Sequence, residues 1–133
     1  MRKLLLYIII ILSPVFLLKC NSHERAVNEE LNIMAQGLNE SAPVMLDKYT
    51  LFERAEVTSD NVFIYRYTVL NTSNPDSLIE SVAKSLDENI KAEFASNPEL
   101  NVFKENNVVI EYVYKDINNQ TIRLIRINPE DYQ

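Results

Sequence analysis

The sequence predicts an α+β fold, a two-layer domain in which two amphipathic helices cover a four-stranded antiparallel sheet. Two segments repeat apolar residues at helical spacing, and four shorter segments are rich in β-branched and aromatic residues. The segments follow the order helix, strand, strand, helix, strand, strand (αββαββ), and an apolar stretch precedes them. We therefore divide the chain into a signal peptide or membrane anchor, residues 1–22, and a single domain, residues 23–133.

The first helix is predicted from Glu24 to Glu40. Its apolar residues recur at positions i, i+4, i+7 and i+11, which form one stripe along a helix: Val27, Leu31, Met34 and Leu38. The helix ends before Pro43, because the residue that precedes a proline is pushed out of the α region.

The first hairpin comprises Leu51 to Thr58 and Val62 to Leu70, joined by a turn at Ser59-Asp60-Asn61. In the first strand, alternation places Leu51, Ala55 and Val57 on one face. In the second strand, one face carries Phe63, Tyr65, Tyr67 and Val69, and the other carries Val62, Ile64, Arg66, Thr68 and Leu70.

The second helix is predicted to begin at Asn74, since Asn74 can cap it and Pro75 suits the first helical position. It extends to about Ala95, and we expect one stripe to face the sheet: Ile79, Val82, Leu86, Ile90 and Phe94. A short further turn is expected from Pro98 to Phe103.

The second hairpin comprises Val108 to Lys115 and Thr121 to Ile127. The connection begins at Asp116 and superficially resembles a calcium-binding loop. It lacks the later ligands and the central glycine of such a loop, so we interpret it as a turn.

The N-terminal segment has the layout of a secretory signal peptide, with Arg2 and Lys3 before an almost unbroken apolar run, Leu4 to Leu18. These 15 residues would form a helix about 22 Å long, shorter than the roughly 30 Å core of a bilayer. The sequence therefore predicts an exported protein of the periplasm or the envelope membrane.

Three forms of the exported protein remain open. Cleavage after Ser22 would leave a soluble protein. Cleavage before Cys20 would leave a lipid-modified N-terminus, for which the two preceding leucines fit but Lys19 departs from the usual small residue. An uncleaved segment would anchor the chain, so the membrane is contacted only through this segment.

Composition excludes several classes of function. The 133 residues include 13 basic and 19 acidic side chains, a net charge of −6; beyond residue 22 the charge is −9, which disfavours nucleic acid and anionic lipid surfaces as partners. One cysteine excludes an internal disulfide, and one glycine, Gly37, excludes a glycine-rich phosphate loop. The single histidine, His23, adjoins the predicted cleavage site, so we expect no enzyme, no cofactor and no metal.

A resemblance covers most of residues 31–132. Leu38-Asn39, Pro43, Asp47, Thr50 and the later Tyr65-Arg66-Tyr67 resemble the L-N-x-x-L-P-x-x-V-D-x-x-T-x-L and Y-x-Y pattern of a family of small, uncharacterised exported bacterial proteins. The family implies a fold and an envelope location but no activity. Its members often carry a cysteine pair, and this chain has Ser96 and Tyr132 at about those positions.

Two hypotheses about function follow. The first is a non-catalytic module that binds a protein or a cell-wall component, and the alternative is a periplasmic inhibitor or immunity protein that neutralises a basic toxin or enzyme. One sheet face is expected to be aromatic and to form the core beneath the helices, with an exposed binding platform as the alternative: Phe63, Tyr65, Tyr67, Tyr112 and Tyr114. The candidate partner surface is a mixed sheet face with a cationic stripe: Arg66, Thr68, Arg123 and Arg126. The sequence leaves the partner and the oligomeric state unknown.

Overall fold

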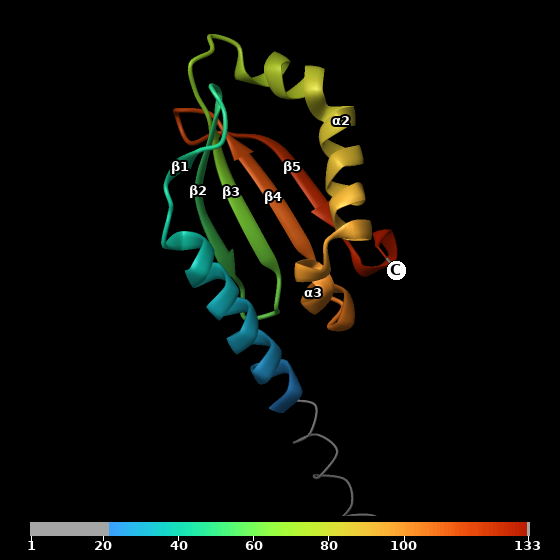
Figure 1. The fold of residues 1–133 in the computed structure, drawn as a ribbon. Coiled ribbons are helices and arrows are strands. Elements are labelled where there is room, and N and C mark those ends of the chain that lie inside the picture. The colour runs from blue at the N-terminus through green and yellow to red at the C-terminus, as the bar shows by residue number, and fades with distance from the viewer. Residues whose placement is uncertain (1–21, 133) are drawn as a thin grey trace, which may run out of the picture.

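The computed structural model describes residues 22–132, and its five strands form one sheet in the order β1-β2-β3-β4-β5 (Figure 1). The strands are β1 Val44–Met45, β2 Thr50–Val57, β3 Phe63–Val69, β4 Ile110–Lys115 and β5 Thr121–Ile127. The last four lie within two residues of the predicted strands. β1 was not predicted, because two residues are too few to show a strand periodicity.

The predicted four-stranded antiparallel sheet is wrong in strand number and in one pairing. β3 and β4 are parallel, with Phe63 opposite Ile110, whereas the other neighbouring pairs are antiparallel. The reason is the long helix α2, Pro75–Ser96, which carries the chain back along the sheet so that β4 starts at the same end as β3. The sheet is therefore mixed.

Besides α2, four helical segments accompany the sheet within residues 22–132. An unlabelled N-terminal helix covers residues 22–39, and the short helix α3 spans Asn101–Glu105. Two 3-10 turns, η1 Pro98–Leu100 and η2 Pro129–Asp131, complete the set. The predicted cap of α2 is confirmed, because the Asn74 side chain accepts a hydrogen bond from the Ser77 amide.

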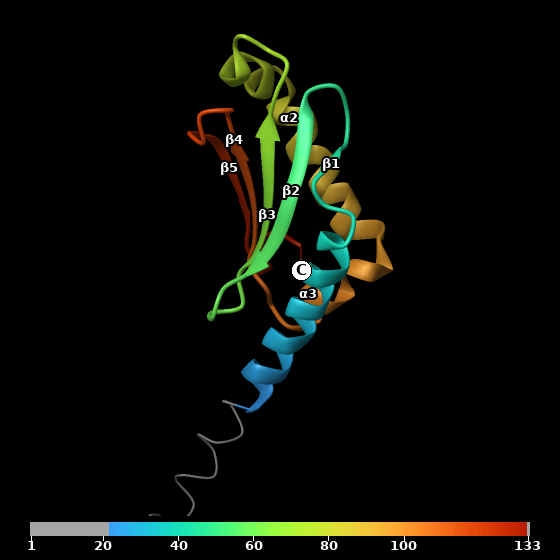
Figure 2. The same cartoon turned by 90° about the vertical axis from the view of Figure 1, so that its left-hand side faces the viewer.

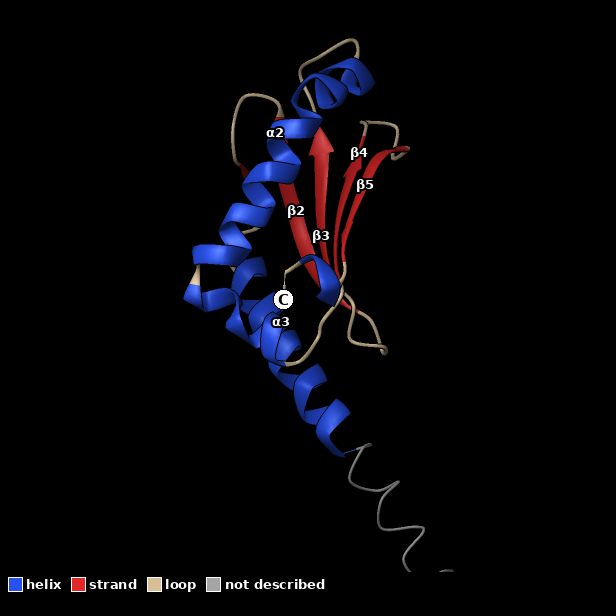
Figure 3. Ribbon diagram, turned by 90° about the vertical axis from the view of Figure 1, so that its right-hand side faces the viewer, coloured by secondary structure: helices blue, strands red, loops and turns tan. Residues whose placement is uncertain are grey.

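The helices lie on one side of the sheet, which we call the helix face, and the opposite side, the open face, is bare (Figures 2 and 3). The N-terminal helix lies across one half of the helix face and α2 across the half that includes β5 (Figure 1). This arrangement gives the two layers that the sequence predicts.

The core lies between these layers. Its fully buried side chains are Leu31, Phe63, Val69, Phe103, Val108 and Ile110. Of the predicted α2 stripe, Ile79, Ile90 and Phe94 are buried and Leu86 is partly buried, but Val82 is 41% exposed. The prediction for Val82 was therefore wrong, and its side chain borders an open hollow described below.

A β-bulge also overturns the predicted faces of β2. Phe52 lies opposite Tyr67 and Arg54 lies opposite Arg66, so Glu53 is an extra residue in the strand. The bulge shifts the alternation by one residue, which puts Phe52 and Ala55 together on the helix face, where both are buried. Leu51, opposite Thr68, belongs to the open face instead.

The predicted signal segment and Cys20 lie outside the described residues. No helix within residues 22–132 is long and apolar enough to cross a membrane.

Candidate functional site

An apolar groove runs along the helix face between the β1–β2 segment and α2. Three adjoining hollows of about 280, 320 and 300 Å³ form it. The first and second share Leu46, and the second and third share Asp47, Thr50, Ile79 and Val82. We define the apolar groove by six lining residues: Leu38, Val44, Leu46, Tyr67, Val82 and Leu86.

Exposed apolar side chains gather in this groove. Of the eight large hydrophobic residues that are exposed within residues 22–132, four line it: Leu38, Val44, Leu46 and Val82. Leu46 is the most exposed of the four, at 58%. Scattered single hydrophobic residues are normal on a protein surface, but a cluster over a hollow marks a binding site.

Stacked aromatic rings form the floor of the apolar groove. Tyr65 stacks on Tyr112 and Tyr67 stacks on Tyr114, with ring centroids 5.0 and 4.8 Å apart. Phe52 adds a tilted contact to Tyr67 at 5.7 Å. The predicted aromatic face is confirmed as part of the core layer, and Tyr65, Tyr67 and Tyr114 also line the hollows.

The tyrosine hydroxyls of the floor stay neutral. Burial raises the pKa of Tyr65 and Tyr114 to about 12, and nearby Asp47 contributes to the shift at Tyr114. Burial likewise raises the pKa values of Tyr67 and Tyr112. Within residues 22–132 none of these four hydroxyls makes a hydrogen bond to another protein group. They are therefore available to donate to, or accept from, a bound molecule.

A larger hollow lies at the start of the N-terminal helix, but its lining is polar and mostly exposed. It measures about 370 Å³ and is bordered by Glu24, Arg25, Asn28, Glu29 and Ser59. Because it lacks a buried apolar floor, the apolar groove is the better candidate.

The open face holds three of the four predicted surface residues. Arg66 and Thr68 lie on β3, and Arg126 lies on β5. Each is paired across strands with a glutamate: Arg66 with Glu56, Thr68 with Glu53, and Arg126 with Glu111. Cross-strand pairs of this kind stabilise a sheet.

The structure does not bring Arg123 to the open face. Arg123 lies opposite Tyr114 on the helix face, beneath α2, where its guanidinium is 3.6 Å from Asp87 and 3.8 Å from Glu80. The reason is alternation, because Arg123 shares its face with the buried Ile125 and Ile127. The predicted cationic stripe therefore contains no Arg123.

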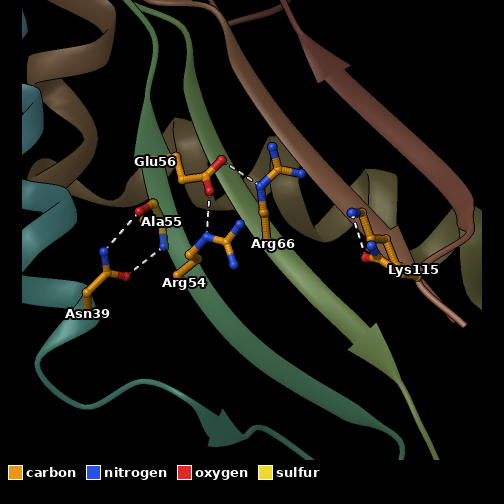
Figure 4. A network of polar contacts seen from close by, with 7 residues as sticks. Asn39, Arg54, Ala55, Glu56, Arg66 and Lys115 are labelled. Atoms are coloured by element: carbon orange, nitrogen blue, oxygen red, sulfur yellow. Dashed lines mark hydrogen bonds and ion pairs between the residues drawn. The ribbon is translucent and has the colours of Figure 1, made fainter. Parts of the chain in front are cut away.

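Glu56 joins two arginines on the open face (Figure 4). Its Oε1 accepts from Arg54 Nε at 2.5 Å and its Oε2 accepts from Arg66 Nε at 2.6 Å. Burial alone would raise the pKa of the Glu56 carboxyl, but the hydrogen bonds and charges of the two arginines outweigh it and hold the pKa below its ordinary value.

The wild-type protein is expected to lose stability as the pH falls from about 6 to about 3. Replacing Glu56 with glutamine is expected to make this loss smaller. The ionised carboxylate contributes stability that is present above the ordinary pKa of 4.5 and is lost as the pH falls through the lower folded-state pKa. Glutamine does not titrate over this window. Urea unfolding at both pH values measures the loss, with Glu88→Gln on exposed α2 as the control. An equal loss in wild type and Glu56→Gln would contradict the prediction.

The turn at Asp116 is confirmed as a hairpin connection. The Asp116 Oδ1 accepts hydrogen bonds from the amides of Asn118 and Gln120, and Asn119 has a positive φ of 66°. Among residues 22–132, no three His, Cys, Asp or Glu side chains are grouped so that they could hold a metal ion.

Comparison with known proteins gives a family and a fold. A family model described as a domain of unknown function, DUF8479, matches residues 25–124. No curated protein matches the chain. Three solved structures have a similar fold, each at 14% sequence identity or less.

The first of these structures is a candidate secreted protein from Pseudomonas aeruginosa, with a TM-score of 0.71 at 14% identity, covering 83% of this chain and 96% of that one. The second is the pilotin EpsS of the type 2 secretion system from Vibrio vulnificus, with a TM-score of 0.64 at 9% identity and coverage of 85% and 97%. The third is the type II secretion system pilotin AspS from Vibrio cholerae, with a TM-score of 0.57 at 11% identity and coverage of 84% and 97%.

Proposed function

Because the chain belongs to the DUF8479 family, whose description states no function, we propose a function from its geometry: it is an exported, non-catalytic protein of the cell envelope whose apolar groove binds a polypeptide segment of another envelope protein. The observation that carries this proposal is the cluster of exposed Leu38, Val44, Leu46 and Val82 over a hollow.

An envelope location is supported by two lines of argument. The sequence has the layout of an export signal in residues 1–22. The fold is that of a candidate secreted protein and of two pilotins of a secretion system. A protein-binding role also agrees with the resemblance to two proteins that are each named as the pilotin of a secretion system.

The composition of the groove supports binding without catalysis. The carboxylate among its lining residues is that of Asp47, and its Oδ1 is occupied by the amides of Tyr49 and Thr50 at 2.7 and 2.9 Å. His23 is exposed in the first turn of the described part of the N-terminal helix, and it does not line the groove. A hydrolase would need a nucleophile beside a fixed base.

The groove fits a helical segment better than an extended one. Its floor is the face of β2, β3 and β4, whose backbone groups already pair within the sheet. An extended peptide lying there would leave its own amides and carbonyls unpaired, whereas an α-helix satisfies them internally. Aliphatic walls formed by Val44, Leu46 and Val82 suit an apolar helix stripe, and they favour a polypeptide over a cell-wall glycan.

Site-specific photo-crosslinking in living cells tests the proposal. A photoreactive amino acid at Leu46 is expected to form one adduct with an envelope protein. The same group at Ile33, which is 63% exposed outside the groove, should form none. A substituted groove variant, Val82→Lys, is expected to reduce the Leu46 adduct at least tenfold, because a charge among apolar walls loses its hydration. Equal adducts at Leu46 and Ile33, or no adduct, would contradict the proposal.

A further inference from the structure

We propose that the open face carries a second binding site, in which Arg54 and Arg66 receive a carboxylate from an acidic segment of a partner protein. This site lies on the opposite side of the sheet from the apolar groove and goes beyond the function proposed for it. Four observations carry the inference: a like-charged pair, free guanidinium edges, a local excess of positive charge and a row of apolar neighbours.

Two arginines face each other directly in the sheet. Arg54 on β2 is the cross-strand partner of Arg66 on β3. Like charges in that position destabilise a sheet, and here both arginines share one carboxylate, that of Glu56 (Figure 4). The cluster therefore keeps one uncompensated positive charge. Local conflicts of this kind are typical of functional positions.

The outer edges of both guanidinium groups are free. Glu56 is bound through the Nε atom of each arginine, and within residues 22–132 no other group bonds the terminal Nη atoms of Arg54 or Arg66. The side chains are 53% and 23% exposed. Paired N–H donors in a planar fork match the two oxygens of a carboxylate.

The open face carries a net positive charge, unlike the chain as a whole. It carries four basic side chains, Arg54, Arg66, Lys115 and Arg126, against three acidic ones, Glu53, Glu56 and Glu111. The chain beyond residue 22 has 10 basic and 19 acidic side chains in total, so its other surfaces hold the whole negative excess. An anionic membrane or a nucleic acid is large enough to be repelled by that negative charge, whereas a single acidic side chain contacts only the arginine pair.

The sheet register continues from the arginines to two apolar residues, Val113 and Leu124. Arg66 lies opposite Val113 of β4, and Val113 lies opposite Leu124 of β5. Leu124 is 53% exposed and lies two strand spacings, about 10 Å, from Arg66. Two turns of an α-helix span about the same distance. The site therefore fits a helix with a glutamate and an apolar residue seven positions apart.

Nuclear magnetic resonance titration tests this site on the full chain in a non-ionic detergent. The probe is a synthetic alanine-rich helical peptide with Glu and Leu seven positions apart, and its control has Gln in place of Glu. The Glu peptide is expected to shift the Nε–Hε signals of Arg54 and Arg66 in a saturable way. The Gln peptide should bind at least about tenfold more weakly, because it lacks the charge-assisted hydrogen bonds of the carboxylate.

Variants of the protein give the matched comparison. Arg66→Gln and Arg54→Gln are each expected to lower the affinity for the Glu peptide about tenfold. Lys84→Gln removes the same charge from exposed α2 and should leave this affinity unchanged. Val82→Lys should leave this binding unchanged, which separates it from the groove. The proposal would be overturned if both peptides bound with equal affinity, or if Lys84→Gln lowered the affinity as much as the arginine variants do. It would also be overturned if the arginine Nε–Hε signals did not shift, or if inorganic phosphate shifted them more than the Glu peptide does.

Discussion

Replacing Phe103 with alanine is expected to lower the free energy of unfolding by about 3–5 kcal/mol, the usual effect of emptying a buried phenylalanine site. Phe103 is fully buried on α3, its ring lies 5.0 Å from Phe63 and 6.2 Å from Phe94, and its carbonyl accepts a hydrogen bond from the Tyr132 hydroxyl. The ring thus joins the sheet to α2, and the backbone carbonyl of the same residue holds the C-terminal segment. The melting temperature should fall by more than about 10 °C.

Chemical denaturation measures this effect, with Leu124→Ala as the control. Leu124 is 53% exposed on the open face, so its truncation should change the stability by less than about 0.5 kcal/mol. Similar unfolding midpoints for the two variants would show that α3 is not part of the cooperative core.

The local elements were predictable because each has a strong periodic pattern. Alternation in Phe63–Val69 assigned the faces of β3 correctly. Of the predicted stripe on the N-terminal helix, Val27, Leu31 and Met34 pack on the core, but Leu38 is 38% exposed and lines the apolar groove. The same alternation places Arg123 with Ile125 and Ile127, so its position on the helix face was also available from the sequence.

The remaining errors concern contacts between distant segments. The parallel pairing of β3 with β4 depends on the end of the sheet to which α2 returns the chain, and no local sequence pattern predicts that end. The bulge at Glu53 depends on the partner strand, because only the register with β3 reveals an extra residue. Turn and periodicity signals do not report either feature.

The apolar groove was missed for the same reason, although one signal pointed to it. A groove forms only when two helices leave part of a sheet face uncovered, and the sequence does not give the distance between them. The signal is the apolar run Val44-Met45-Leu46, which lies outside every predicted element. A hydrophobic run without an element to bury it indicates a binding surface.

Asn39 covers part of the outer edge of β2, the edge that faces away from β3 (Figure 4). The Asn39 side chain accepts a hydrogen bond from the Ala55 amide at 2.7 Å and donates one to the Ala55 carbonyl at 2.9 Å. β1 pairs with Leu51 and Phe52 farther along the same edge. A side-chain amide thus takes the place of a neighbouring strand and links the N-terminal helix to the sheet.

Replacing Asn39 with alanine is therefore expected to destabilise the protein by about 2 kcal/mol, because a partly buried donor and acceptor of Ala55 both lose their partner. The Asn39→Asp variant keeps an oxygen that accepts from the Ala55 amide, but its second carboxylate oxygen faces the Ala55 carbonyl. This variant should therefore be less stable than wild type at neutral pH. Its deficit should shrink below about pH 4, where a protonated carboxyl can donate again. Urea unfolding at both pH values measures these differences, and Asn89→Ala on exposed α2 should change the stability by less than about 0.5 kcal/mol. A pH-independent deficit in Asn39→Asp, or a loss in Asn39→Ala no larger than that of Asn89→Ala, would mean that the amide does not hold this edge.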